Sequence, residues 1–333
     1  MTDNHDDDAR RSRLVGIKLR ALAGDHAGRP MPEPTEFAPG AALLDGDTAW
    51  VLLDRRPAER LGAALAWALR SGATRLDLVA DEGAGILARR AAEFDLPVSV
   101  WQPAGRLLIP VDAAPLPPSD PAPDHHEVLR PLIVEGGADP IVEHGVLTGE
   151  VRGLEVCRVV DDAATGATRL EVGVGEHDRE AFQMLHGDVP AVESLARVVD
   201  SVGVHRAPAA PPHPLKALGA ERLIRWRVEQ EPELVGATMV APAPPPLPRR
   251  NLKDPVPCAA VGISSAGERI VVVCSSGVDL DLIPYAADAR LALGESGVGG
   301  EELVVVLPSR DRIGLVGELA DQLRHSVSVV TVD

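Results

Sequence analysis

Two regions of the chain, one near each end, combine short apolar runs with stretches of helical periodicity. The apolar runs cover residues 50–54, 76–80 and 98–101 in the first region, and 270–274, 303–307 and 327–332 in the second. Between these runs, apolar residues recur at helical spacing over 59–71, 84–94, 280–293 and 313–324. The apolar runs do not alternate with polar residues, which is typical of strands buried on both faces of a parallel sheet. The pattern predicts an α/β fold in which strand, helix, strand, helix and strand follow one another twice.

The region between these two units has a different pattern. The runs 151–160 and 168–175 flank a glycine-containing turn and predict an antiparallel hairpin. Helices are expected at 178–186, 192–202 and 215–229. This part of the chain is therefore predicted to be a central α+β region.

Proline-rich stretches divide the chain, because proline fixes φ and removes a backbone donor. Residues 1–13 are polar and expected to be disordered, and residues 14–22 are expected to form a short helix. The predicted segments are a polar N-terminal segment with a short helix at 1–40, a Rossmann-like α/β unit at 41–112, a linker at 113–123, the central region at 124–240, a linker at 241–255 and a second Rossmann-like unit at 256–333. We expect the two Rossmann-like units to be separate, because a long central region lies between them.

The chain is strongly acidic. Its 50 aspartates and glutamates outnumber its 33 lysines and arginines, and the formal net charge is −17. Such a surface repels phosphate backbones and anionic membranes, so general nucleic-acid binding is disfavoured. Basic residues cluster at 10–20 and 248–253, where we expect a solvated helix face and a linker.

The remaining composition favours a cytoplasmic protein. The three cysteines, Cys157, Cys258 and Cys274, are few, and none has the spacing of a structural zinc site or a disulfide framework. The N-terminal residues lack the apolar core of a signal peptide, and no stretch is apolar over the length of a membrane span. We therefore expect no membrane contact, and a partner that is a small anionic ligand or another protein.

The predicted hairpin brings acidic side chains together. If its turn is centred near Ala164, Glu155, Cys157 and Glu171 share one face, and the apolar residues share the other. The two glutamates would then be diagonal neighbours, within about 7–8 Å at the backbone. Gly173 leaves this face uncovered, so that a ligand could approach closely.

Histidine and acidic residues directly after the hairpin extend this candidate site. The candidate ligands of a divalent ion such as Mg²⁺ or Mn²⁺ are Glu155, Glu171 and Asp178, and the candidate catalytic residues are His177, Arg179 and Glu180. The alternative is structural, because alternating polar residues also mark a solvent-facing strand. Asp178 followed by Glu180 is also typical of the start of a helix.

The segment 150–180 resembles the core of the PD-(D/E)XK nucleases, in which a hairpin places acidic residues around a metal ion. Glu155 corresponds to the early acidic residue of that core and Glu171 to the glutamate of its E-x-K element. Position 173 is glycine where the family has lysine, so the group that orients water or stabilises developing charge is missing. Arg169 or Arg179 would have to replace it. The resemblance implies metal-dependent hydrolysis of phosphoesters.

The loop after the apolar run that ends at Cys274 is a second candidate site. Ligands of open parallel sheets bind at the carboxyl ends of strands, and Ser-Ser-Gly before a helix offers backbone donors to an anion. The candidate cofactor-binding residues are Ser275, Ser276, Gly277 and Asp279. The corresponding loop of the first unit, 81–85, is acidic, and neither loop has a dinucleotide or P-loop motif. The alternative is an ordinary turn between a strand and a helix.

The histidines outside the hairpin region have no metalloprotease spacing. His125, His126, His144 and His213 lie in or near sequence rich in proline and glycine, and we expect them to be surface or loop residues. Three functions fit these observations. The chain is a metal-assisted hydrolase that uses the acidic hairpin, a non-catalytic ligand-binding module that uses the strand-end loops, or a scaffold for protein partners.

Overall fold

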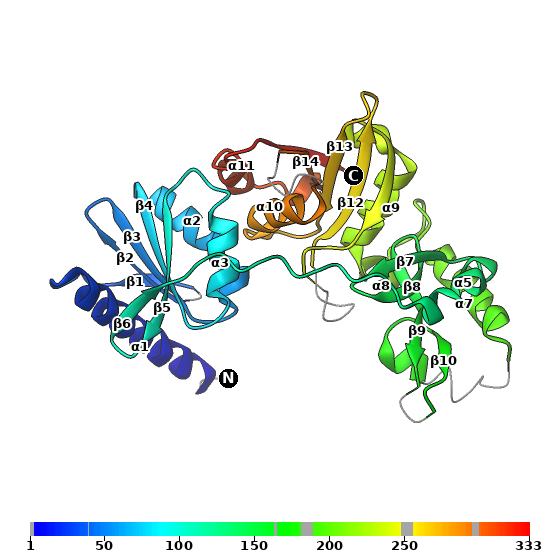
Figure 1. Ribbon diagram of the computed structural model, residues 1–333, viewed down its shortest axis with the longest axis horizontal. Coiled ribbons are helices and arrows are strands. Elements are labelled where there is room, and N and C mark those ends of the chain that lie inside the picture. The colour runs from blue at the N-terminus through cyan, green and yellow to red at the C-terminus, as the bar shows by residue number, and fades with distance from the viewer. Residues whose placement is uncertain (1–2, 39, 163–164, 181–188, 248–255, 295–299) are drawn as a thin grey trace. The chain divides into compact units, whose positions relative to one another are not determined.

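The computed structural model describes residues 3–38, 40–162, 165–180, 189–247, 256–294 and 300–333, with the backbone alone for residues 3–9 (Figure 1). The described chain forms two compact units. The first comprises Met1–Leu116, Val278–Asp288 and Ile313–Val327, and the second comprises Pro117–Gly277, Ala289–Arg312 and Ser328–Asp333. Three separate sheets lie in these units, so the fold is α/β with mixed and antiparallel sheets.

The first unit is built around a six-stranded sheet in the order β1-β2-β3-β4-β5-β6. Its strands are β1 (Thr35–Phe37), β2 (Gly40–Asp45), β3 (Thr48–Leu53), β4 (Arg75–Ala80), β5 (Val98–Ala104) and β6 (Leu107–Pro110). The middle strands β3, β4 and β5 are parallel, whereas β1, β2 and β6 pair antiparallel at the two edges. The parallel strands are the three apolar runs of the sequence.

Helices α1 (Asp3–Ala27), α2 (Leu61–Arg70) and α3 (Ala84–Ala91) cover the two faces of this sheet. The unit also includes η1 (Pro57–Glu59), the first part of α10 (Leu282–Leu293) and α11 (Gly314–Ala320), which contacts α2. Helix α1 packs Val15, Leu19 and Leu22 on one face, against Trp50 and Leu52 of β3. Figure 1 shows α2 and α3 on the opposite face.

Buried ion pairs hold helix α10 within the first unit. Asp288 accepts hydrogen bonds from Arg89 at 2.7 Å and from Arg90 at 3.0 Å, and Asp281 accepts one from Arg90 at 3.0 Å. The side chains of all four residues are at least nine-tenths buried. A buried charge without a partner is costly, so these pairs favour the packing of α10 with α3, which carries Arg89 and Arg90.

The second unit contains two sheets. The antiparallel sheet has the order β10-β9-β8-β7, and the mixed sheet has the order β11-β12-β13-β14-β15. The strands are β7 (Asp139–Glu143), β8 (Val146–Val151), β9 (Leu154–Asp161), β10 (Thr168–Val172), β11 (Ala237–Ala243), β12 (Cys258–Ser264), β13 (Arg269–Cys274), β14 (Glu302–Pro308) and β15 (Val327–Val332). Strands β13 and β14 are parallel, and β11 and β12 extend the sheet antiparallel.

The helices of the second unit pack against these sheets. They are α4 (Asp124–Glu127), α5 (Arg130–Glu135), α7 (Ala191–His205), α8 (Pro214–Ala217), α9 (Ala220–Gln230), η2 (Pro232–Val235) and η3 (Ser309–Asp311), and residues 176–180 are also helical. Ile133, Leu147, Val156 and Leu195 belong to the core of the antiparallel sheet. No helix in the described part of the chain is both long and apolar enough to cross a bilayer.

Two local predictions were wrong, and several strands were not predicted. Helix α1 begins at Asp3, so residues 3–13 are helical rather than disordered, and aspartates near a helix N-terminus are stabilised by its dipole. The helix expected at 215–229 is broken, because Leu218 is extended and Gly219 has φ +55. The edge strands β1, β2 and β6 and the hairpin β7–β8 were not predicted. The end of the helix expected at 178–186 lies outside the described residues.

The hairpin β9–β10 forms, but in a different register from the one assumed. Glu171 pairs with Arg158 and Val172 pairs with Cys157, a shift of one residue. Cys157 therefore faces the core instead of sharing a face with Glu171. A β-bulge then changes the face on which Glu155 lies, because Val156 has no partner where β8 pairs with β9.

Candidate metal centre

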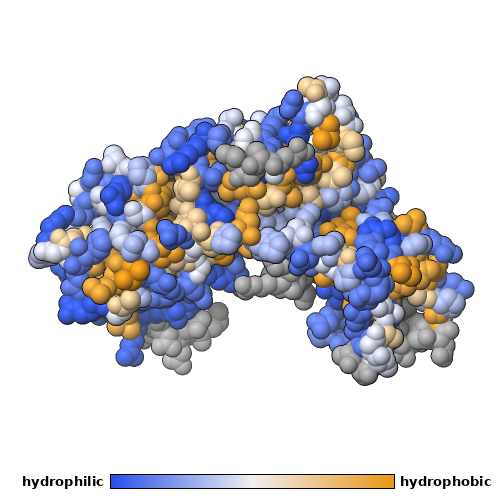
Figure 2. Space-filling model, in the orientation of Figure 1, coloured by the Kyte–Doolittle hydropathy of each residue, from blue (hydrophilic) through white to orange (hydrophobic). Residues whose placement is uncertain are grey.

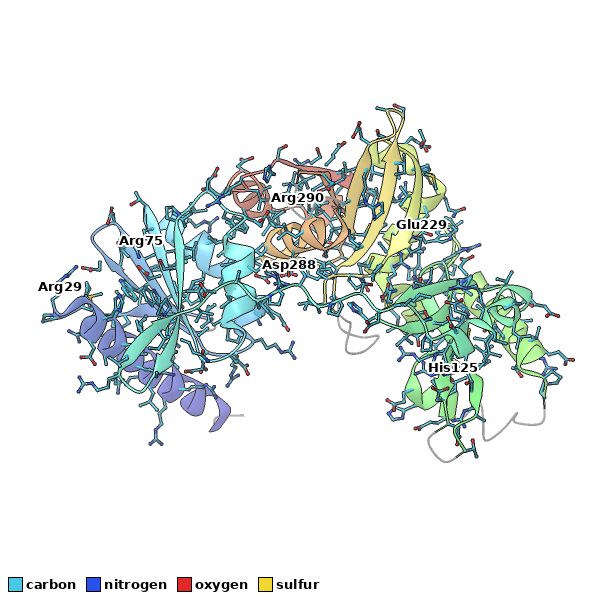
Figure 3. The ribbon with its side chains drawn as sticks, in the orientation of Figure 1. Arg29, Arg75, His125, Glu229, Asp288 and Arg290 are labelled. Atoms are coloured by element: carbon cyan, nitrogen blue, oxygen red, sulfur yellow. The ribbon has the colours of Figure 1, made fainter. Side chains whose placement is uncertain are left out.

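Two histidines and an aspartate converge at one end of the β9–β10 hairpin. His125 and His126 lie in α4, and Asp161 is the last residue of β9; Figure 3 labels His125 beside this hairpin. His125 Nε2 is 3.1 Å from Asp161 Oδ2, and His126 Nε2 is 3.1 Å from Asp161 Oδ1. One ligand atom of each residue lies within 4.8 Å of the others. These three form the only group of three such residues with metal-binding geometry in the described part of the chain.

Local structure positions each of these side chains. The carbonyl of Pro123 accepts hydrogen bonds from the amides of His126 at 2.8 Å and Glu127 at 3.1 Å, which starts the short helix α4 directly after the proline-rich segment. Asp161 is held from the other strand, because Thr168 is its partner in the ladder and donates its hydroxyl to Oδ1 at 2.9 Å. The site therefore joins a proline-determined turn to the end of a hairpin.

The protonation states favour cation binding. Hydrogen bonds from His125 and then from Thr168 lower the pKa of Asp161 to about 2, so this carboxylate is ionised at neutral pH. His126 is only 9% exposed, and neither of its ring nitrogens has a hydrogen-bond partner. Its Nε2 lies close to Asp161 without the alignment of a hydrogen bond. A buried imidazole nitrogen without an aligned hydrogen bond is costly, and a cation shared by His126 Nε2 and the Asp161 carboxylate would remove that cost.

The donor set suits a transition metal. Two imidazole nitrogens and one carboxylate oxygen are typical of zinc and of first-row metals such as iron, whereas magnesium prefers oxygen ligands. Three protein ligands also leave coordination positions for water. The side chains of His125 and Asp161 are 57% and 47% exposed, so solvent reaches the site.

The acidic residues predicted as ligands lie elsewhere on the same hairpin. Glu155 is 3% exposed, and Arg158 binds its two oxygens at 3.0 and 3.1 Å. Arg179 contacts both glutamates, with Nη1 3.1 Å from Glu155 and Nε 3.6 Å from Glu171. The register shift and the bulge together place the two glutamates on one face after all. Guanidinium groups occupy the space between them, so the cluster satisfies its own charges.

The other predicted hairpin residues are separated from this cluster or make local contacts. Asp178 accepts a hydrogen bond from the amide of Val174 at 2.7 Å. The His177 side chain is 98% exposed and lies 3.7 Å from Glu180, on the outer surface of the helical turn. Of the predicted catalytic residues, the structure therefore brings only Arg179 to the two glutamates.

Gly173 does permit a close approach, but the chain itself makes it. Gly173 has φ +140, and a Cβ at this position would lie 2.9 Å from the amide nitrogen of Arg179. The segment that carries Asp178 and Arg179 thus covers the surface that the sequence left open. This contact and the positive φ explain why the position is glycine.

The predicted anion loop after β13 is divided between the two units. Ser275, Ser276 and Gly277 belong to the second unit, and Asp279 belongs to the first. The amide of Gly277 donates to the carboxylate of Asp311 at 2.8 Å. Ser275 is buried, and its amide donates to the carbonyl of Val306 at 2.9 Å. The chain's own acceptors therefore use two of the backbone donors that an external anion would need, the amides of Ser275 and Gly277.

Asp279 makes a local turn in the first unit. Its carboxylate accepts a hydrogen bond from the amide of Asp281 at 2.9 Å, and burial raises its pKa. A carboxylate with these properties disfavours a second anion nearby. Its geometry matches the structural alternative, a turn before a helix.

A buried ion network crosses the second unit near strands β7 and β8. Arg225 binds Glu150 at 2.6 Å and Glu143 at 3.2 Å, and Arg222 binds the same two glutamates. Burial raises the pKa of Glu229 to about 7, despite its contact with Arg225 at 3.1 Å. This network has no signal in the sequence pattern, because Glu143 and Glu150 of β7 and β8 are distant along the chain from the arginines of α9.

The His125, His126 and Asp161 cluster was also missed. In the sequence, this cluster is indicated by the adjacent histidines, His125 and His126. The prolines before them favour a loop, so the pair is not predicted as a site. Nothing in the spacing connects residue 125 with residue 161.

Comparison with known proteins does not extend these observations. No protein-family model, no curated protein and no solved structure matches the chain. The resemblance to the nuclease core therefore gains no support, and any function must be argued from the chain's own residues.

Proposed function

We propose that this protein is a metal-dependent hydrolase whose metal centre consists of His125, His126 and Asp161. The observation that carries this proposal is the buried ring of His126, which has no hydrogen-bond partner and lies beside an ionised carboxylate. Water satisfies a histidine on the surface, whereas a buried imidazole needs a hydrogen-bond partner or a bound cation. The metal we expect is zinc or a similar transition ion rather than Mg²⁺.

The reaction follows from the open coordination positions. His125, His126 and Asp161 would hold the ion, which would lower the pKa of a bound water to about 7 and so supply the nucleophile. Hydrolysis of a phosphoester would form one P–O bond to the water oxygen and break the P–O bond to the leaving alcohol, which would take up the proton that the water loses. Water is the only co-reactant. Small phosphoesters are the first substrates to test, because the net charge of −17 disfavours long polyanions.

Three further expectations belong to this proposal. The parallel strands β3, β4 and β5 support the interpretation of the N-terminal unit as Rossmann-like. The parallel pair β13 and β14 supports the same interpretation near the C-terminus. We propose a cytoplasmic location, where the buried thiols remain reduced. We also propose that the substrate is the main small-molecule partner.

Metal binding is tested first by calorimetric titration of chelator-treated protein with Zn²⁺, Mn²⁺ and Mg²⁺. One zinc ion per chain should bind, and His126→Gln should weaken that binding. His177→Gln is the matched control, because this histidine is fully solvated. Equal zinc affinity for His126→Gln and the native chain would reject the metal centre.

Hydrolysis is tested next on the zinc-loaded protein, with p-nitrophenyl phosphate and bis(p-nitrophenyl) phosphate as substrates. Release of nitrophenol should require zinc and should be lost in His125→Gln. The His177→Gln variant should keep the activity. Zinc bound at this centre without turnover of either ester would reject the hydrolase and leave the metal centre in place.

A further inference from the structure

A groove of about 950 Å³ lies along helix α1 in the first unit. It is bounded on one side by a stripe of α1 at helical spacing, which includes Arg10, Arg13, Ile17 and Arg20, and on the other by the segment 30–36. Figure 1 shows α1 running along this unit. The volume is in the range of small-molecule sites. The groove lies entirely within one unit and is independent of the metal centre.

Helix α1 sorts its basic residues by face. Arg11 binds Asp54 at 2.5 Å and Lys18 binds Asp81 at 2.7 Å, so these two cations contact the residues that follow β3 and β4. They do not line the groove. The basic cluster of the sequence is therefore partly structural.

The cations of the groove stripe differ in their pairing. Arg20 pairs with Glu33 and donates to the carbonyl of Met31 at 3.0 Å. Arg10 and Arg13 have no ion-pair partner among the described residues, and both are exposed. Two free guanidinium groups one helical turn apart are well suited to a carboxylate, phosphate or sulfonate. They are notable in a chain whose net charge is −17.

The groove also has apolar walls next to these cations. Ile17 is 60% exposed, and Met31 is 3% exposed. Pro34 adds a third apolar side chain. In Figure 2, hydrophobic and hydrophilic residues are mixed on the part of the first unit where α1 and β6 lie. A large aliphatic side chain exposed beside two unpaired arginines favours a ligand with both characters.

We propose that this groove binds a small amphipathic anion. Its acidic group contacts Arg10 and Arg13, and its aliphatic or aromatic body lies over Ile17, Met31 and Pro34. The groove is also lined by Glu36 and by Glu33, which pairs with Arg20, so Arg10 and Arg13 are the cations available to the acidic group.

Two fluorescent probes separate the parts of this proposal. 1-Anilinonaphthalene-8-sulfonate is an amphipathic anion, and N-phenyl-1-naphthylamine has the same aromatic body without the charge. Both should bind the full native chain, and the anion should bind more tightly. Charge reversal in the Arg10→Glu/Arg13→Glu variant should weaken the anion at least about tenfold and leave the neutral probe within about twofold.

Groove filling provides the second variant. Ala21→Trp places a large side chain on an exposed position of the groove stripe, and it should weaken both probes at least about fivefold. Arg197→Glu, an exposed arginine on α7, is the charge control and should change neither. Circular dichroism and urea unfolding of each variant establish that the fold is retained.

The outcomes are decisive in either direction. Weaker binding of the anion alone in the double variant, together with weaker binding of both probes in Ala21→Trp, supports the site. Absence of anion binding to the native chain overturns the proposal. Anion binding that neither α1 variant changes also overturns it, because the probe then binds elsewhere.

Discussion

The two ends of the β9–β10 hairpin differ in how their charges are satisfied. At one end, Arg158 and Arg179 bind the carboxylates of Glu155 and Glu171. At the other, Asp161 lies between two imidazoles, and the buried His126 has no hydrogen-bond partner. The first end has more charge, and its buried Arg169 Nε and Arg179 Nε also lack a hydrogen bond. At the second end the atoms without a hydrogen bond are imidazole nitrogens, which can ligate a metal ion, whereas guanidinium nitrogens cannot.

The largest effect we predict is on stability at the paired end. Glu155→Ala should lower the free energy of unfolding by about 3 kcal/mol, because it leaves the buried guanidinium of Arg179 without its nearest carboxylate. Urea denaturation measures this loss. Glu180→Ala, at an exposed position, should change it by less than about 0.5 kcal/mol. A loss for Glu155→Ala no greater than for this control would contradict the structural role of the cluster.

At the unpaired end, the effect should be on metal affinity. Asp161→Asn removes the one anionic ligand of the proposed centre and should weaken zinc binding about 100-fold or more. Glu171→Gln should keep the native affinity within about threefold, since Arg169 and Arg179 already pair with this carboxylate. Calorimetry on the two variants compares the ends directly. If Glu171→Gln weakened zinc binding more than Asp161→Asn does, the acidic cluster would be the better candidate for the metal site.

Glu229 belongs to the buried ion network of the second unit, and it tests how burial changes the stability that a carboxylate provides. Its pKa in the folded state is raised from 4.5 to about 7, chiefly by burial, so the native state holds a proton that the unfolded state releases between these values. Stability should therefore fall as pH rises from about 4.5 to 7, by roughly 2 kcal/mol after allowance for relaxation. Glu229→Gln should remove this slope and be more stable than the native chain at pH 8. Identical urea midpoints across pH 4.5–8 for both proteins would contradict the shift.

The smallest predicted effect concerns the residue that orients Asp161. Thr168→Val keeps the side-chain shape but removes the hydroxyl that donates to Oδ1 at 2.9 Å. Zinc affinity should fall about tenfold, as is usual for loss of a hydrogen bond to a metal ligand. Thr165→Val, in the hairpin turn, is the matched control, because its hydroxyl contacts Asp162 instead. Equal losses in the two variants would indicate a general effect on the hairpin.

The sequence predicted the elements whose burial is encoded locally. Strands β3, β13 and β14 contain uninterrupted apolar runs, and Asp77 alone interrupts the run of β4. Such runs are recognisable without knowledge of their neighbours. The edge strand β1 has three residues and was missed, because its structure depends on pairing with β2. Helix α1 was predicted too short, because its first residues are polar and have no apolar periodicity that would indicate a helix.

The candidate site could be predicted only in part. The hairpin was expected from its pattern, but its register depends on a turn, and the face of Glu155 depends on a bulge opposite β8. A bulge of one residue reverses every inference from alternation. The proposed metal centre combines the turn after Pro123 with the end of β9, and this tertiary contact has no counterpart in local spacing.

The measurement that tests the central claim most directly is X-ray absorption spectroscopy of the protein loaded with one equivalent of zinc. The account predicts a first shell of nitrogen and oxygen at about 2.0–2.1 Å, with the multiple scattering of two imidazoles. Loss of that imidazole signal in His126→Gln would assign it to this centre. A shell of oxygen alone, or sulfur at about 2.3 Å from the buried cysteines, would contradict the account.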